Sequence, residues 1–592
     1  MAEADKILLD RRIGSTLERL VERFSADAYR GAQIDLWVFD GLERRSRATN
    51  LLAGRGVAAR IRSAYKPLVH AFLEEIDLDG VSGIVLRYPV IAGVAENRFL
   101  LEAYPLTDLV GARPVTFEQA APGALDGPPL YCVELARNDG RVERILVAAP
   151  NRFHMDPLKE MVLSSTGWLR IRAAENPDLD CDQRIETDQE AAFQAVMSVL
   201  EERQWPDAGA CFERLTLRVE APFYDCRLGA EAGGFFSTAE AMHEDLYFSA
   251  LEFFKAKRGL AAGDRTFQPG RIVPQIVTRQ GPVRVRITLG AEPPARLMND
   301  GANILPPDDL ATAGHWLQPE AIKRHLDGLG GDAYQAVSRR GRPVWGTHIP
   351  GPGPQMVISA GQHANETSGP IGALRAAQRL KRQGAIGFAV SALENPDGFA
   401  LFREFCAVHP EHMHHAARYT AGGGDLEYVA RGFENEIRHL ARAKTGADVH
   451  LNLHGYPAHE WTRPFTGYVP RGFETWTIPK GFFLILRTRP GWKALGDAIL
   501  RAIVDDLADY EPLVALNRAQ LSRYLRYVPA PPFEIRKDIP VFASEVDTGL
   551  FPVTIITEAP DETIYGPDFI VAHTAQMRAV LAAAAALAAG AS

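Results

Sequence analysis

The stretch MVISAGQHANETSG, Met356–Gly369, decides the fold. Its apolar run ends at Gly361, and His363 and Glu366 follow with two residues between them. A glycine after a buried strand lets the backbone turn, so an imidazole and a carboxylate three residues apart can converge on one metal ion. A bare H-x-x-E pair is weak, with about one chance match expected in a chain of this length. The strand and the glycine make the pattern more specific, and we expect a metal site here.

Three further segments follow in the same half of the chain. They read LENPDGF (Leu393–Phe399), DVHLNLHGYP (Asp448–Pro457) and VTIITEAPDE (Val553–Glu562), and GRPVWG (Gly341–Gly346) precedes them all. In this order the segments resemble those of the zinc carboxypeptidase family, the carboxypeptidase A-like metallopeptidases. The resemblance begins near Tyr334 and covers less than half of the chain.

Strands and helices alternate along this part of the sequence. The apolar runs predict strands, and the apolar periodicities predict helices at Ser368–Gln383 and Asp425–Lys444. Such alternation favours an α/β fold with helices on both faces of a sheet and with the site at the strand ends. The resemblance implies that the central sheet is mixed. The predicted strands are Met356–Ala360, Gly387–Leu393, Val449–Leu453 and Val553–Thr557.

The resemblance assigns the metal ligands to His363, Glu366 and His454. Three protein ligands leave the fourth position of Zn²⁺ open for water, which is the catalytic arrangement. His450 lies four residues before His454, on the same face of the predicted strand, and is the alternative third ligand. We prefer His454 because it stands at the predicted strand end, before Gly455.

The family's general base corresponds to Glu558, with Glu545, Asp561 and Glu562 as rivals. Hydrolysis at zinc needs a carboxylate that takes a proton from the bound water and passes it to the leaving nitrogen. An acid at the end of an apolar strand suits this role, because partial burial raises its pKa toward neutrality.

The substrate-binding segment departs from the family pattern. Asp425 matches the aspartate that orients the first zinc histidine, and Arg418 falls where the family has an arginine that polarises the scissile carbonyl. Glu427 and Tyr428 stand where the family has Asn and Arg, so the fork that grips a terminal carboxylate is missing.

Other polar groups lie outside these motifs. We expect the histidines between the second and third segments to be solvated loop residues, with metal binding as the alternative. His459 and Glu460, which follow the third-ligand strand, are candidates for the mouth of the pocket. The loop histidines are His409, His412, His414 and His415.

Length predicts more than one folding unit. A chain of 592 residues is too long for one core. We predict two N-terminal α/β regions of unknown role, 1–160 and 161–330, and a zinc carboxypeptidase-like catalytic domain at 335–592.

Composition narrows the class of protein. A formal net charge of −9 disfavours a dedicated nucleic-acid binder. The five scattered cysteines predict reduced thiols rather than a disulfide framework. The charged N-terminus predicts no signal peptide, and no apolar run looks long enough to cross a bilayer. We therefore expect a cytoplasmic protein without a membrane or nucleic-acid partner.

These observations predict a zinc-dependent hydrolase, a metallopeptidase that cleaves an amide bond in a peptide or a peptide-like substrate. Two alternatives stay open. The G-x-H-x-N-E-T form resembles the family's desuccinylase and aspartoacylase branch, whose members deacylate small N-acyl amino acids, whereas NPDG leans toward the peptidase and murein-peptide-amidase branches. The second alternative is a catalytically inactive binding protein.

Overall fold

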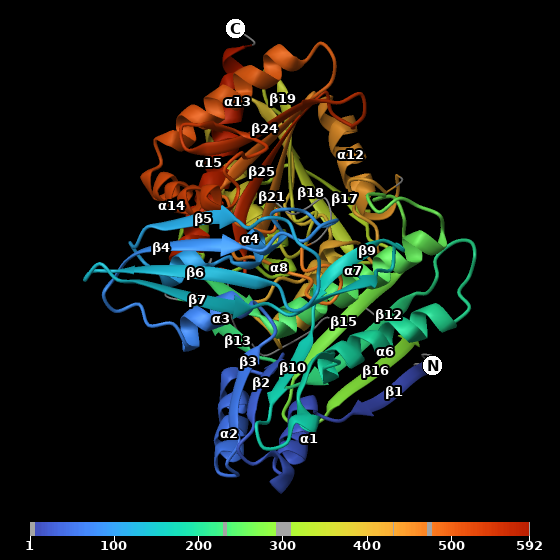
Figure 1. The fold of residues 1–592 in the computed structure, drawn as a ribbon. Coiled ribbons are helices and arrows are strands. Elements are labelled where there is room, and N and C mark those ends of the chain that lie inside the picture. Colours follow the sequence, from blue (N-terminus) through green and yellow to red (C-terminus); the bar gives the residue numbers. More distant parts are fainter. Residues whose placement is uncertain (1–5, 229–233, 292–308, 430, 470–475, 591–592) are drawn as a thin grey trace.

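A nine-stranded sheet dominates the C-terminal half of the computed structural model, which describes residues 6–228, 234–291, 309–429, 431–469 and 476–590 (Figure 1). Strands β20, β19, β21 and β25 run parallel in the centre, and β22 pairs antiparallel with β25. The sheet is therefore mixed, as predicted. Its strands, in spatial order, are β17 (Asp332–Val337), β18 (Pro343–Ile349), β20 (Gly387–Ser391), β19 (Gln355–Ala360), β21 (Val449–Pro457), β25 (Val553–Glu562), β22 (Phe483–Thr488), β24 (Ile539–Glu545) and β23 (Glu534–Arg536).

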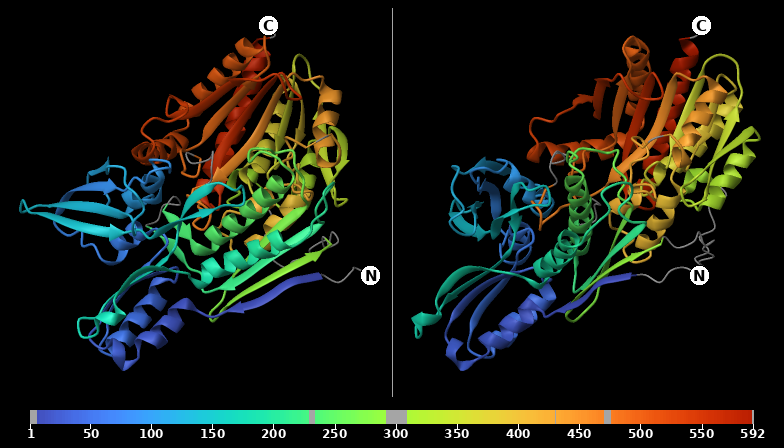
Figure 2. Two further views of the ribbon diagram at one scale, coloured as in Figure 1. Left: turned by 45° about the vertical axis from the view of Figure 1, so that its right-hand side comes forward. Right: turned by 90° about the vertical axis from the view of Figure 1, so that its right-hand side faces the viewer.

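Helices cover both faces of this sheet (Figures 1 and 2). Successive side chains of a strand point to opposite faces, so Val357 of β19 packs beneath α12 while Met356 and Ile358 join the core under α9. Helices α9 and α13 each pack on α15, and α12 contacts β17, β18 and β20. The α/β prediction is confirmed. These helices are α9 (Ser368–Gln383), α12 (Glu436–Thr445), α13 (Lys493–Ala508) and α15 (Pro567–Ala589).

One predicted helix begins in the wrong place. The sequence predicts a helix from Asp425, whereas a 3₁₀ turn at Phe433–Asn435 leads into α12 at Glu436. Asp425 instead anchors a turn, because its side chain accepts the backbone N–H of Glu427 at 3.1 Å. Gly432 then adopts a φ of +130°, which interrupts any continuous helix.

The N-terminal half is mixed α/β, as predicted, and forms three four-stranded sheets among the described residues. Helix α7 (Thr238–Lys257) packs on β15 and runs below the large sheet (Figure 1). One cluster of buried apolar side chains includes Leu217 and Leu246 of this half together with Ile358 and Ile555. The domain boundaries remain predictions. The three sheets are β1 (Lys6–Ile13), β16 (Val283–Gly290), β12 (Arg214–Ala221) and β15 (Arg271–Thr278); β11 (Cys181–Ile185), β10 (Gly167–Arg172), β2 (Gln33–Val38) and β3 (Ala58–Ser63); and β5 (Val115–Gln119), β4 (Val81–Tyr88), β6 (Leu130–Arg137) and β7 (Val142–Ala148).

Helix α15 corrects one expectation about apolar segments. It has 23 residues and is long and apolar enough to cross a membrane by length and composition alone. It nevertheless packs as a core helix, because 56% of its apolar window is buried. Gln576 on α15 also donates to Ser368 Oγ at 2.8 Å, inside the fold.

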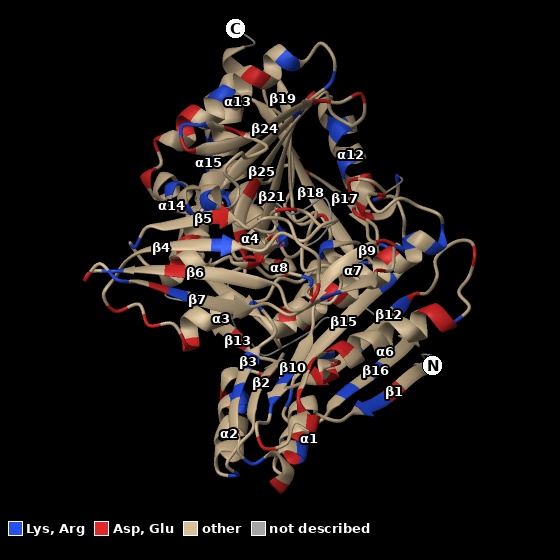
Figure 3. Cartoon of the chain, viewed as in Figure 1, with Lys and Arg blue, Asp and Glu red and all other residues tan. Residues whose placement is uncertain are grey.

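Charged side chains of both signs are interspersed along the outer elements (Figure 3). This mixture accords with the modest formal net charge of −9. All five cysteines are free thiols, as expected. The predicted absence of nucleic-acid and membrane partners and the cytoplasmic location remain predictions.

Candidate metal centre

The turn after β19 brings the first two predicted ligands together. Gly361 has a φ of +64°, and a Cβ there would lie 3.0 Å from the backbone of Leu393, so this position requires glycine. His363 and Glu366 follow on the turn, and α9 begins two residues later. The LENPDGF segment crosses directly beside them, because the backbone N–H of Asn395 bonds the Gly361 carbonyl at 2.9 Å.

The NPDG motif has a scaffolding role here. Asn395 caps α10 (Pro396–Cys406) by accepting the backbone N–H of Gly398 at 2.8 Å. Asp397 accepts bonds from Ser338 Oγ at 2.9 Å and from Arg342 Nη1 at 2.6 Å. Arg342 belongs to the GRPVWG segment, so the hydrogen bonds of Asp397 tie the NPDG motif to that segment.

His363, Glu366 and His454 converge in the interior. One ligand atom from each lies within 4.8 Å of the others, and all three side chains are buried. His363 Nδ1 lies 2.8 Å from Glu366 Oε1, and His454 Nδ1 lies 3.0 Å from both His363 Nδ1 and Glu366 Oε2. Two imidazole nitrogens and a carboxylate are a donor set that suits zinc, and the set leaves a coordination position open.

His450 does not join this set. Its Nε2 lies 2.7 Å from Ser359 Oγ, and its ring packs against Phe551. β21 also continues past the predicted strand end to Pro457, so His454 projects from within the strand.

Second-sphere groups hold the ligands in place. Asp425 Oδ1 lies 3.4 Å from His363 Nε2, the ring nitrogen that faces away from Glu366. Burial and the neighbouring Arg418 both lower the pKa of His363. The carboxylates of Glu366 and Asp425 outweigh them, so the pKa of His363 is raised. For Glu366, burial raises the pKa, and the neighbouring His363, Arg418 and His454 reverse this and hold it well below its usual range.

Arg418 and Glu558 complete the predicted set. Arg418 ends the short helix α11 (His415–Arg418), and its Nη1 donates to Glu366 Oε1 at 2.8 Å. Glu558 lies within β25 rather than at its end, directly opposite His454 in the parallel register. Both Arg418 and Glu558 line the cavity of about 550 Å³ that contains His363 and His454.

Glu558 is the acid among its rivals that faces this cavity. Burial, with Glu366 adding to it, raises the pKa of Glu558 well above its usual value. Glu545 is exposed at the end of β24, and Asp561 accepts the backbone N–H of Ser368 at 2.7 Å. Glu562 is buried and does not line this cavity.

The cavity wall beside Asp425 lacks the expected fork. Glu427 lines the cavity, accepts Arg438 Nη1 at 2.5 Å and lies 3.8 Å from Arg487 Nη1. Arg463 also lines the cavity, but it forms a two-pronged pair with Glu252 at 2.6 and 2.8 Å. Arg487 and Arg265, whose guanidinium lies over the Tyr428 ring, are the cavity-lining arginines beside Glu427 and Tyr428.

Helix α7 contributes residues that the sequence analysis missed. Phe248, Leu251 and Glu252 line the cavity from the N-terminal half. Glu240 accepts His459 Nε2 at 2.8 Å, and Glu244 is bonded to His415. The four acids of this helix, Glu240, Glu244, Asp245 and Glu252, were a usable signal, because such groups are rarely buried without partners.

Two expectations about polar loops are wrong. His459 and Glu460 are buried away from the cavity, since His459 binds Glu240 and Glu460 pairs with Lys66. His412, His414 and His415 are also buried rather than solvated. Histidine-rich loop sequence did not reveal that α7 and β15 cover this segment.

Gly455 allows strands β21 and β25 to approach closely. Its backbone N–H donates to Glu366 Oε2 at 3.0 Å. A Cβ at this position would lie 1.9 Å from Asp561 Oδ1.

Comparisons with known proteins give fold-level matches only. No protein-family model matches the chain, and no curated protein is similar to it. Among solved structures it is similar to a metallo-carboxypeptidase from Burkholderia cenocepacia (13% identity, 53% of this chain and 76% of that one, TM-score 0.29). It is also similar to a metallo-carboxypeptidase from Pseudomonas aeruginosa in complex with (2-guanidinoethylmercapto)succinic acid (15%, 52% and 74%, TM-score 0.29) and to the carboxypeptidase A from Helicoverpa armigera (13%, 48% and 75%, TM-score 0.30). At such identities and TM-scores the likeness assigns no activity, and the conclusions below rest on this chain's own residues.

Proposed function

We propose that the protein is a zinc-dependent hydrolase that cleaves an amide bond in a peptide or peptide-like substrate. The observation that carries the proposal is the convergence of His363, Glu366 and His454 beside a cavity that Glu558 also lines. A zinc ion held there would polarise the scissile carbonyl and lower the pKa of a bound water.

The chain's own residues supply the remaining functions. Glu558 accepts a proton from the attacking water and returns it to the leaving nitrogen; its raised pKa suits both steps. Arg418, whose guanidinium already contacts Glu366, places a permanent positive charge beside the carbonyl oxygen, where negative charge develops. Asp425 keeps the His363 ring oriented.

The cavity sets the size class of the substrate. A volume of about 550 Å³ falls in the range of sites for small ligands and short peptide segments. Phe248, Trp461 and Phe483 supply apolar surface, and Glu427 and Arg487 supply both charges on one wall. This lining fits an amide substrate with an apolar side chain and a polar end.

The test is a screen of the purified zinc-loaded protein against peptides with free, amidated and non-peptide C-termini and against small N-acyl amino acids. Turnover of peptides that stops on zinc removal and returns on zinc addition supports the proposal. Turnover confined to N-acyl amino acids would replace the peptidase assignment with a deacylase. Stoichiometric zinc without turnover of any amide would make the protein a binding protein.

A further inference from the structure

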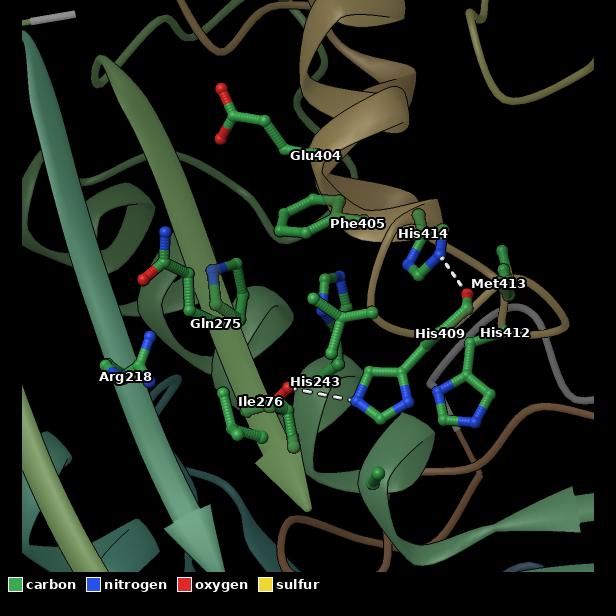
Figure 4. Close-up of a pocket in the computed structure, with 14 residues that line it drawn as sticks. Arg218, His243, Gln275, Ile276, Glu404, Phe405, His409, His412, Met413 and His414 are labelled. Carbon is green, nitrogen blue, oxygen red and sulfur yellow. Dashed lines mark hydrogen bonds between the residues drawn. The ribbon is translucent and has the colours of Figure 1, made fainter. Parts of the chain in front are cut away.

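A second group of histidines surrounds a separate cavity between α7, β15 and the loop after α10. The cavity has a volume of about 120 Å³ and is lined by His243, His409, His412, His414 and Met413, among others (Figure 4). His243, His412 and His414 are at most 5% exposed. Val408 lines the same cavity and is 53% exposed, so the cavity has a route to solvent.

Two of these imidazoles present a bare nitrogen. His414 Nε2 donates to the His409 carbonyl at 2.9 Å, which leaves Nδ1 as a lone pair (Figure 4). The ring of His243 is held by a backbone hydrogen bond with Pro274, and its Nε2 has no partner in the part of the chain that the structure describes. His414 Nδ1 likewise has no partner among the described residues. Each of these nitrogens is a lone pair without a partner, so each needs an electrophile or a donor.

Both rings are neutral at physiological pH. Burial, reinforced by His412 and His409, lowers the pKa of His243 to about 3. Burial, with His243 and His412 adding to it, also holds the pKa of His414 well below its usual value. Neutral imidazole is the form that binds metals.

The ring separation leaves room for one ion to contact both nitrogens. The two ring centroids lie 5.8 Å apart, with the rings at 65°. Metal–nitrogen bonds of about 2.0 Å predict a centroid separation of about 5.2 Å at a tetrahedral angle and about 6.4 Å at a linear one. The observed value lies between these limits.

The remaining ligand chemistry selects the ion. His409 Nε2 is bonded to the Ile276 carbonyl and His412 Nε2 to Asp225, so these atoms are already engaged. The lining carboxylate Glu404 pairs with Arg214. Among the described residues, only the set of His363, Glu366 and His454 offers three converging ligand atoms, so a tetrahedral zinc site does not form here.

We propose that His243 and His414 form a two-coordinate site for a monovalent soft cation, Cu(I), in a cavity that Met413 also lines. A monovalent ion costs less to bury without an anionic ligand than a divalent one does. Imidazole and thioether are ligands that copper accepts, and Cu(I) is stable with two of them. A water that donates both of its hydrogens is the competing occupant.

The test titrates the full-length, zinc-loaded protein with Cu(I) under anaerobic conditions against a chromophoric Cu(I) chelator. Zinc occupies the His363 site, so uptake reports on other sites. We expect one equivalent of Cu(I) to leave the chelator, with X-ray absorption at the copper edge showing two nitrogen neighbours. Since loss of an outer-shell partner alone costs about 10–100-fold in affinity, His243→Leu and His414→Leu should each cost about 100-fold or more.

His409→Gln and His412→Gln are the matched controls, because their rings line the same cavity but their Nε2 atoms are engaged. Both should keep the Cu(I) affinity, and all variants keep the five free cysteines. If the protein does not withdraw Cu(I) from the chelator, water is the occupant and the proposal is overturned. An unchanged Cu(I) affinity in the two leucine variants, relative to the wild type, would also overturn it. So would a copper-edge spectrum that shows only sulfur neighbours. If the leucine variants do not fold, the copper-edge spectrum of the unchanged protein decides.

Discussion

The strand ends of the large sheet and helix α7 both place buried acids around one cavity, but they use them differently. Glu366 and Glu558 lie at the sheet, where one joins two histidines and the other faces the cavity. Glu240, Glu244 and Asp245 on α7 are each bonded to residues of the C-terminal half. The comparison teaches that burial of an acid does not identify a reactive group. What distinguishes the two sets is whether the carboxylate belongs to the ligand cluster or the cavity wall, or instead holds a residue of the other half of the chain in place.

The largest expected effect separates the metal ligands from the α7 acids. His363→Ala, Glu366→Ala and His454→Ala should each lose bound zinc and all activity, because two ligands do not hold the ion. Glu240→Gln is the control and should retain one zinc per chain. Metal content by atomic absorption and kcat on the best amide substrate measure the difference. Retention of zinc by His454→Ala with its loss in His450→Ala would show that the third ligand is misassigned.

Glu558→Gln should keep zinc and fold but lose activity. An amide cannot take the proton of the attacking water, and general acid–base catalysis contributes about 10²–10⁴-fold to the rate. The measurement is kcat at saturating substrate together with zinc content. Glu545→Gln is the matched control, because Glu545 is exposed at the end of β24. A near-normal kcat in Glu558→Gln would move the role to another acid.

Asp245 on α7 should make stability depend on pH. Burial, opposed by Arg463, raises its pKa to about 7, so the folded state holds a proton that the unfolded state releases near pH 4. This group's contribution to the free energy of unfolding is therefore present at low pH and falls by about 3 kcal/mol between pH 5 and pH 8. Chemical unfolding of the wild type and Asp245→Asn at both pH values measures it. The variant should show a smaller decrease, and an identical decrease in both proteins would refute the assignment.

The smallest effect concerns the cavity wall near Glu427. Because Glu427 and Tyr428 replace the Asn-Arg pair, free and amidated C-termini of one peptide series should differ by less than about 100-fold in kcat/KM. A larger preference for the free acid would mean that Arg487 grips the carboxylate. Arg487→Gln would then remove that preference. Arg463→Gln tests whether Arg463, which pairs with Glu252, binds the carboxylate instead.

Sequence reasoning predicted the parts of the site that depend on local chain order. Strand β19, Gly361, His363 and Glu366 lie within twelve residues of one another. Strands β21 and β25 can be predicted from their apolar runs. The start of α12 was misplaced because the apolar period of Leu426, Val429 and Phe433 continues through a turn. The side chain of Asp425 decides that turn through a backbone bond, which periodicity does not report.

The long-range pairings could not be predicted. His459 with Glu240 and Lys66 with Glu460 join residues 219 and 394 positions apart. No local pattern specifies which acid a distant histidine meets, because that choice follows from how α7 packs below the sheet. For the same reason the loop histidines looked solvated, although His412 and His414 are buried.

Gly455 has a consequence for how variants of this chain would be selected. The space in which its missing side chain would stand is already taken by the carboxylate of Asp561, and its backbone N–H holds Glu366. In a saturation library screened for activity, this position should accept no replacement, not even alanine, and so behave like a metal ligand although it binds nothing. Shortening Asp561 at the same time would remove the closest clash and leave the tight contact with the Ala559 carbonyl, so the two positions should behave as an epistatic pair.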